Sequence, residues 1–175
     1  MILQTERLLL RELTMNDLDD LYEILSDPET MAHYPRPKTR EESEKWILRN
    51  IERYNTDGFG LWAIELKETN QFIGECGITL QNIDGQMLPE IGYHINKNFR
   101  KKGYATEAAT ACRDYGFDKL NFDEIYSYMK YTNIASSRVA EKNGMTFIKE
   151  YPDEINEFVK VYRITKDDYT KIERS

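Results

Sequence analysis

Three strand-like runs in the middle of the chain constrain its fold more than any other feature. They occupy residues 59–66, 71–81 and 87–95, and the turn dipeptides Thr69-Asn70 and Asp84-Gly85 separate them. Connections this short join neighbouring strands that run in opposite directions. The sequence therefore predicts an antiparallel meander at the centre of the fold.

One strand and two helices are predicted before the meander. Residues 7–13 form the strand, and Thr14 caps a helix that stops before Asp27-Pro28. Thr39 and Glu42 have capping-box spacing at the start of the second helix. Its apolar stripe includes Trp46, which is expected in the core together with Trp62.

A helix, a strand, a second helix and two further strands are predicted after the meander. Their approximate ranges are 103–118, 124–130, 134–143, 145–151 and 157–165. A strand, a crossover helix and a second strand normally close as parallel neighbours, so 87–95 should pair in parallel with 124–130. No repeat or linker interrupts the pattern. The prediction is a single α+β domain over residues 1–175, with a mixed, mostly antiparallel central sheet flanked by helices.

Charge and cysteine content exclude several classes of protein. The net charge of −7 argues against a nucleic-acid partner and suits an amine-bearing substrate. Cys76 and Cys112 lack CxxC spacing, so neither a disulfide framework nor a metal site is expected. The apolar run from Leu8 to Leu10 is too short for a signal peptide or membrane span. A cytoplasmic protein without a membrane partner is expected.

A cation-rich stretch lies directly between a predicted strand and a predicted helix. Arg100, Lys101 and Lys102 precede Gly103, and an alanine-rich helix follows. Backbone N–H groups at a helix start have no intrahelical partner and attract anions, and a glycine lets a ligand approach the backbone. The stretch is either a solvated loop or a pyrophosphate site. The GxxxxGK and GxGxxG patterns are absent, which argues against ATP and NAD.

The six residues RKKGYA from Arg100 to Ala105 resemble the R/Q-x-x-G-x-G/A motif of the GNAT superfamily of acyl-CoA-dependent N-acetyltransferases. The preceding EIGYHI resembles that fold's fourth strand. Asn133-x-x-Ser136 and the following VAEKNGM resemble the family's strand-to-helix turn and closing motif, with Met145 in place of the usual Phe. With the opening TERLLLREL, the resemblance covers nearly the whole chain and is closest to the ribosomal-protein alanine N-acetyltransferase (RimJ/RimL-like) branch.

The resemblance implies acetyl-CoA as co-substrate. Its pyrophosphate would lie on backbone amides from Lys101 to Thr106, within the motif that also contains Arg100, Tyr104 and Ala105. The pantetheine arm would enter where the parallel strand pair splays apart. Ile95 would donate its backbone N–H to the thioester carbonyl, and Asn133 and Ser136 would lie near the pantetheine or sulfur.

The resemblance also implies a base near the start of the strand 87–95. Glu90 and His94 share one face of this strand with Gly92, at about 13 Å between the two Cα atoms. Either one is a candidate base for the incoming ammonium, with Glu90 preferred.

The tyrosine that acts as the acid in the family corresponds to Ala140 in this sequence, so this role does not transfer, and Ser136 is the substitute candidate. His33 and Tyr34 lie in the proline-rich join where the family places part of its acceptor site. Glu107 is expected only to offset the helix dipole.

These features predict direct acetyl transfer to a primary amine. The branch favours a protein N-terminus, and the alternatives are a small amine such as a polyamine or an antibiotic, or a non-catalytic acyl-CoA-binding module. The resemblance leaves a monomer and a homodimer equally open.

Overall fold

The computed structural model describes residues 1–174. Its strands are β1 (Leu3–Gln4), β2 (Leu8–Glu12), β3 (Leu61–Leu66), β4 (Phe72–Ile83), β5 (Gln86–Ile95), β6 (Glu124–Lys130), β7 (Thr146–Asp153) and β8 (Glu157–Thr165). Its α-helices are α1 (Leu18–Leu25), α2 (Arg40–Thr56), α3 (Tyr104–Asp118), α4 (Ile134–Lys142) and α5 (Lys166–Glu173). Two short 3-10 turns, Met15–Asp17 and Lys97–Phe99, precede α1 and follow β5.

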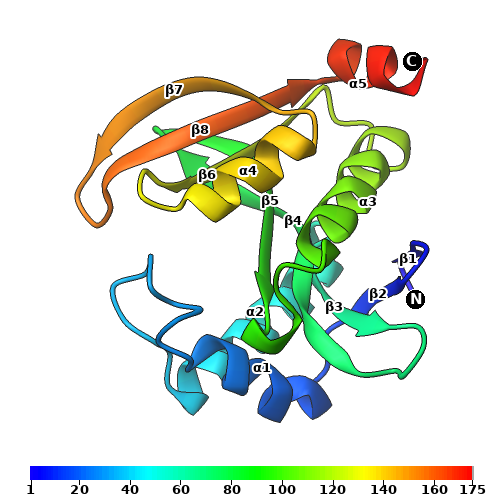
Figure 1. Cartoon of the computed structure of the whole chain (residues 1–175), viewed down its shortest axis with the longest axis vertical. Coiled ribbons are helices and arrows are strands. Elements are labelled where there is room, and N and C mark those ends of the chain that lie inside the picture. The colour runs from blue at the N-terminus through cyan, green and yellow to red at the C-terminus, as the bar shows by residue number, and fades with distance from the viewer. Residues whose placement is uncertain (175) are drawn as a thin grey trace.

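All eight strands form one sheet in the order β1-β2-β3-β4-β5-β6-β8-β7. Every neighbouring pair is antiparallel except β5 and β6, which are parallel. The predicted meander and the predicted parallel pair are therefore confirmed. Figure 1 shows β4 and β5 crossing the middle of the molecule, with the β7–β8 hairpin arching away from them.

Two elements were not predicted. The strand β1 has two residues, which is too short for an alternating pattern to appear in the sequence. The helix α5 is polar apart from a few positions, but Thr165 and Asp168 form a capping box at its start. Tyr169 anchors this helix because its ring stacks on Phe117 of α3, at 4.7 Å between centroids.

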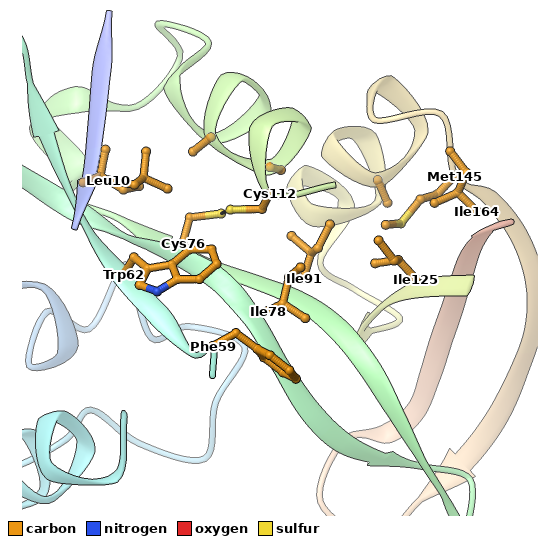
Figure 2. Close-up of a cluster of buried hydrophobic side chains, with 14 of the residues drawn as sticks. Leu10, Phe59, Trp62, Cys76, Ile78, Ile91, Cys112, Ile125, Met145 and Ile164 are labelled. Atoms are coloured by element: carbon orange, nitrogen blue, oxygen red, sulfur yellow. Dashed lines mark hydrogen bonds between the residues drawn. The ribbon is translucent and has the colours of Figure 1, made fainter. Parts of the chain in front are cut away.

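The helices cover the two faces of the sheet separately. The larger core lies under α3 and α4, where the sulfurs of Cys76 and Cys112 approach to 3.6 Å (Figure 2). Trp62 is fully buried in this core, as predicted. The smaller core joins α1 and α2 to the other face through Leu21, Leu25 and Ile47.

The parallel pair is joined over only a short length. Glu90 pairs with Tyr126, and the Ser127 hydroxyl donates a hydrogen bond to the Ile91 carbonyl at 3.1 Å. Toward the C-terminal end of β5, no further register pair with β6 occurs within residues 1–174. On the other edge of β5, the Asn96 N–H bonds the Ile73 carbonyl at 2.8 Å. Because antiparallel bonds alternate, the Ile95 N–H faces away from β4, on the side of the gap beside β6.

Candidate active site

A cleft of about 410 Å³ opens on the α2 face of the sheet. Its floor is formed by β4 and β5, and its walls by α2, the α1–α2 loop, β6, the start of α4 and the β7–β8 turn. The cleft brings together six of the residues singled out from the sequence, which are His33, Tyr34, Glu90, His94, Asn133 and Ser136. Two other groups of predicted cofactor residues lie outside its lining, namely Ile95 at the end of β5 and residues 100–106 after it.

A chain of hydrogen bonds runs from Tyr34, whose ring is partly exposed, to the buried floor of the cleft. The Tyr34 hydroxyl lies 2.8 Å from His94 Nε2, and His94 Nδ1 lies 2.9 Å from Glu75 Oε1. The indole N–H of Trp46 donates to both Glu75 oxygens, at 3.0 and 3.1 Å. Burial raises the pKa of the Tyr34 phenol, and the negative charges of Glu90 and Glu75 raise this pKa further. Tyr34 therefore stays protonated, and its hydroxyl and the Glu75 carboxylate hold the two ring nitrogens of His94.

Trp46 packs against the smaller core, as predicted, and this chain also places it in the cleft. The chain adds a residue that the sequence reasoning missed. Trp46 lines the cleft and contacts His94 edge-on, with 5.8 Å between ring centroids. Glu75 is completely buried in β4 and lies opposite His94 in the sheet register. The available signal was a single carboxylate inside the apolar run FIGECGITL, since a buried carboxylate needs hydrogen-bonding partners.

Glu90 is a buried carboxyl with a perturbed acidity. Burial raises the pKa of Glu90 to about 8, against the opposing effects of a Tyr128 backbone hydrogen bond and the charge of Arg53. Gly92 leaves room for this side chain, because a Cβ at Gly92 would lie 3.1 Å from Glu90 Oε2. A carboxyl that ionises near pH 8 is suited to accept a proton from an amine.

Tyr93 points to the opposite face of β5, toward the gap. Its hydroxyl is buried and has no well-formed hydrogen bond within residues 1–174. Burial raises the pKa of the Tyr93 phenol, and the nearby Ser136 hydroxyl partly offsets this effect. Tyr93 and Ser136 both line the cleft where it reaches the start of α4. The position expected for the family's tyrosine is Ala140, which is buried in the core.

Asn133 has a structural function that the sequence did not predict. It occupies the N-cap of α4, and its side-chain oxygen accepts a hydrogen bond from the Ser136 N–H at 3.2 Å. This bond fixes the start of α4 beside the gap. His33 lies at the rim of the cleft, with its Nδ1 3.3 Å from the Thr132 hydroxyl. Burial lowers the pKa of His33, and the positive charge of Lys130 lowers it further.

The start of α3 has the geometry of an anion site. Gly103 is the N-cap at φ +85°, and Lys101 is also left-handed at φ +61°. Because glycine has no side chain to cap the helix, the first-turn N–H groups of residues 104–106 are open to an external acceptor. The site therefore fits a pyrophosphate, with the Lys101 and Lys102 side chains exposed around it.

Arg7 was not predicted as part of this anion site. Its guanidinium lies 4.4 Å from the Tyr104 ring centroid and donates to the Lys102 carbonyl at 2.9 Å. Glu107 holds Arg7 through its Nε at 2.7 Å and also accepts a hydrogen bond from the Thr5 hydroxyl. The expectation that Glu107 only offsets the helix dipole was therefore wrong, because this residue ties the β1–β2 turn to α3.

Arg100 is engaged by neighbouring protein groups. Its guanidinium donates to the Thr30 hydroxyl at 2.6 Å, to Glu29 at 3.3 Å and to the Ile95 carbonyl at 3.3 Å. These bonds join the end of β5 to the α1–α2 loop. Arg100 thus positions the strand end whose N–H faces the gap, and a direct contact with a cofactor stays a prediction.

A sheet whose parallel pair separates beside a helix N-terminus is the arrangement of the GNAT acetyltransferases, and the chain belongs to this family. A family model described as an acetyltransferase (GNAT) domain matches residues 7–146. The protein is therefore an N-acetyltransferase.

Among residues 1–174, no helix is long and apolar enough to cross a membrane. In the same residues, no cluster of three or more His, Cys, Asp or Glu side chains is placed to hold a metal ion.

Individual relatives support the same assignment. The uncharacterised protein YkkB of Bacillus subtilis is 39% identical over 148 residues, covering 84% of this chain and 86% of YkkB. A crystal structure of an acetyltransferase from Agrobacterium tumefaciens matches with a TM-score of 0.81 and 30% identity over 94% of each chain. RimL, a ribosomal L7/L12 α-N-protein acetyltransferase solved with coenzyme A, shares the fold at 17% identity and a TM-score of 0.79, covering 95% of this chain and 98% of that one. This likeness shows that the two proteins share the fold.

Proposed function

We propose that this protein transfers an acetyl group directly from acetyl-CoA to a primary amine, with a protein N-terminus as the favoured acceptor. The observation that carries the proposal is Glu90, a buried carboxyl whose pKa is raised to about 8 at the floor of the cleft. An amine must lose a proton before it attacks a thioester, and Glu90 is suited to take it. His94 is the alternative base, and Tyr34 and Glu75 hold it in place.

Acetyl-CoA would be held by the start of α3 and by the gap beside β5. The backbone amides from Lys101 to Thr106 would bind its pyrophosphate, with Arg7, Lys101 and Lys102 at the rim. The Ile95 N–H would donate to the thioester carbonyl oxygen, where negative charge develops during attack. Acetyl-CoA supplies the activated acetyl group, and Asn133 and Ser136 would border its pantetheine arm.

Direct transfer is favoured over an acetylated enzyme because no suitable thiol reaches the cleft. Cys76 and Cys112 are both fully buried on the other face of the sheet. Burial raises the pKa of the Cys76 thiol, and its hydrogen bond with Cys112 raises this pKa further. The nucleophilic thiolate is therefore disfavoured.

The proposal is tested by CoA release across acceptors. We expect the protein to release CoA from acetyl-CoA in the presence of short peptides with a free N-terminus, at rates well above hydrolysis. Peptides whose N-terminus is already acetylated are the matched control and should give no release. Activity only with polyamines or aminoglycosides would favour the small-amine alternative. Tight acetyl-CoA binding without release on any amine would indicate a non-catalytic acyl-CoA-binding module.

Tyr93 is our candidate for the proton donor to the departing sulfur, in place of the tyrosine absent at Ala140. Its phenol stays protonated, borders Ser136 and is free to donate a hydrogen bond. Tyr93→Phe should lower kcat about 10-fold, less than full acid catalysis contributes, because a thiol of pKa near 8.5 already leaves well. KM for acetyl-CoA should change little.

Two variants separate this role from packing. Tyr115→Phe removes another phenol hydroxyl on the same side of the sheet, outside the cleft, and should retain the full kcat. An acetyl donor with a more acidic thiol leaving group should restore most of the rate in Tyr93→Phe. Equal loss of rate with both donors would remove Tyr93 from this role.

A further inference from the structure

The cleft is rich in positive charge although the chain is acidic overall. Arg49 and Arg53 on α2 and Lys130 on β6 line it, against one lining carboxyl group, Glu90. Glu90 and the buried Glu75 beneath His94 are two carboxyl groups against three cations, and burial shifts Glu90 toward its protonated form. The local excess of cations stands against a net charge of −7 for the whole chain.

Arg49 and Arg53 lie one helical turn apart on α2 without a carboxylate partner. Neither guanidinium has an acidic group within ion-pair distance in residues 1–174, and the hydrogen bond that Arg53 makes is to Asn50 Oδ1, at 3.4 Å. Arg40, at the start of the same helix, pairs with Asp19 at 2.5 Å. Two like charges at this spacing repel each other. A bound anion would relieve the repulsion.

The position of the pair relative to Glu90 follows from the contacts of α2. Trp46 contacts His94, and Arg53, two turns further along α2, acts electrostatically on Glu90, four residues before His94. The helix therefore crosses the cleft antiparallel to β5. This arrangement puts both guanidiniums alongside the part of the cleft where the amine would lose its proton.

We infer that the acceptor carries a carboxylate close to its reactive amine, and that Arg49 and Arg53 bind this carboxylate. The inference rests on the proposed function and narrows its substrate class. Guanidinium groups form paired, charge-assisted hydrogen bonds with carboxylates. An acidic side chain within the first residues of a polypeptide has this chemistry, and so does the α-carboxylate of a free amino acid. A polyamine would meet three cations with further positive charges of its own.

The experiment compares acceptors of opposite charge. Peptides that begin Ala-Glu-Glu, Ala-Gln-Gln and Ala-Lys-Lys are assayed for CoA release, with free glutamate and spermidine alongside them. We expect the lowest KM for the Glu peptide and the highest for the Lys peptide and spermidine. A higher activity on free glutamate than on the Glu peptide would assign the carboxylate to a small molecule.

Variants test the two arginines directly. Arg49→Gln should raise KM for the Glu peptide about 10- to 100-fold, the effect of losing a charge-assisted hydrogen bond, with kcat within a few-fold. KM for the Gln peptide should stay unchanged. Arg53→Gln should have the same effect on KM and also shift the pH profile, because Arg53 acts on Glu90. Lys45→Gln changes the net charge equally on the same helix, outside the cleft, and should leave both constants unaltered.

A binding measurement separates this inference from the proposed function. Calorimetric titration of the Glu peptide in the presence of CoA reports acceptor binding without turnover. If no amine is acetylated but the peptide binds wild-type protein and binds Arg49→Gln at least 10-fold more weakly, the arginine site stands and the transfer proposal fails. Equal affinity of wild-type and Arg49→Gln protein for the Glu peptide, or absence of binding to both, overturns the inference. A preference for the Lys peptide or spermidine in the wild type overturns it as well.

Discussion

Replacing Glu90 with glutamine should lower kcat/KM for the amine acceptor by about 10²- to 10⁴-fold, the usual contribution of a general base. Glutamine keeps the size of the side chain but accepts no proton from an ammonium ion. In wild-type protein, kcat/KM should rise with pH through an apparent pKa near 8, because burial keeps the carboxyl protonated below that value. The rise should flatten in Glu90→Gln, as measured by initial rates of CoA release between pH 6 and 9.5.

The controls for this prediction concern the cofactor and the second candidate base. Acetyl-CoA affinity should be the same in wild type and Glu90→Gln, since Glu90 lies in the acceptor cleft rather than at the start of α3. Full rates in Glu90→Gln with a large loss in His94→Ala would transfer the role of base to the histidine. Full activity in both variants would mean that the amine arrives already neutral from solvent.

The fold was predictable where local signals repeat a simple pattern. Turn dipeptides at Thr69-Asn70 and Asp84-Gly85 separate the meander strands, and both have a residue at positive φ as such turns require. The capping box at Thr39 and Glu42 is present at the start of α2. The missed elements are those without a local period, namely the two-residue β1 and the polar α5, whose stability comes from contacts with distant residues.

Spacing in the sequence groups only those candidate site residues that share one element, whereas His33, Tyr34, Asn133 and Ser136 were named through the family resemblance. The cation and glycine motif is one contiguous stretch that leads into α3, and Glu90 and His94 lie on one strand, so spacing alone indicates the common face of this pair. Glu75 meets His94 only through the register of β4 against β5, which the sequence does not specify to one residue. Arg49 and Arg53 reach the cleft because α2 crosses the sheet, and that crossing depends on tertiary packing.

Gly103→Asp should weaken acetyl-CoA binding by at least about 100-fold, or roughly 3 kcal/mol. Gly103 starts α3 in a left-handed conformation at φ +85°, and an added Cβ would lie 3.3 Å from Arg7 Nη2. A carboxylate at this position would pair with Arg7 and so neutralise a cation of the anion site. It would also repel the pyrophosphate, because near a protein surface two like unit charges at 4 Å repel by roughly 4 kcal/mol. Gly103→Asn is the matched control, because asparagine has the same size and tolerates positive φ without the charge. Calorimetry should show a much smaller loss for Asn than for Asp. If a folded Gly103→Asp protein bound acetyl-CoA as tightly as wild type, the pyrophosphate site would have to lie elsewhere than the start of α3.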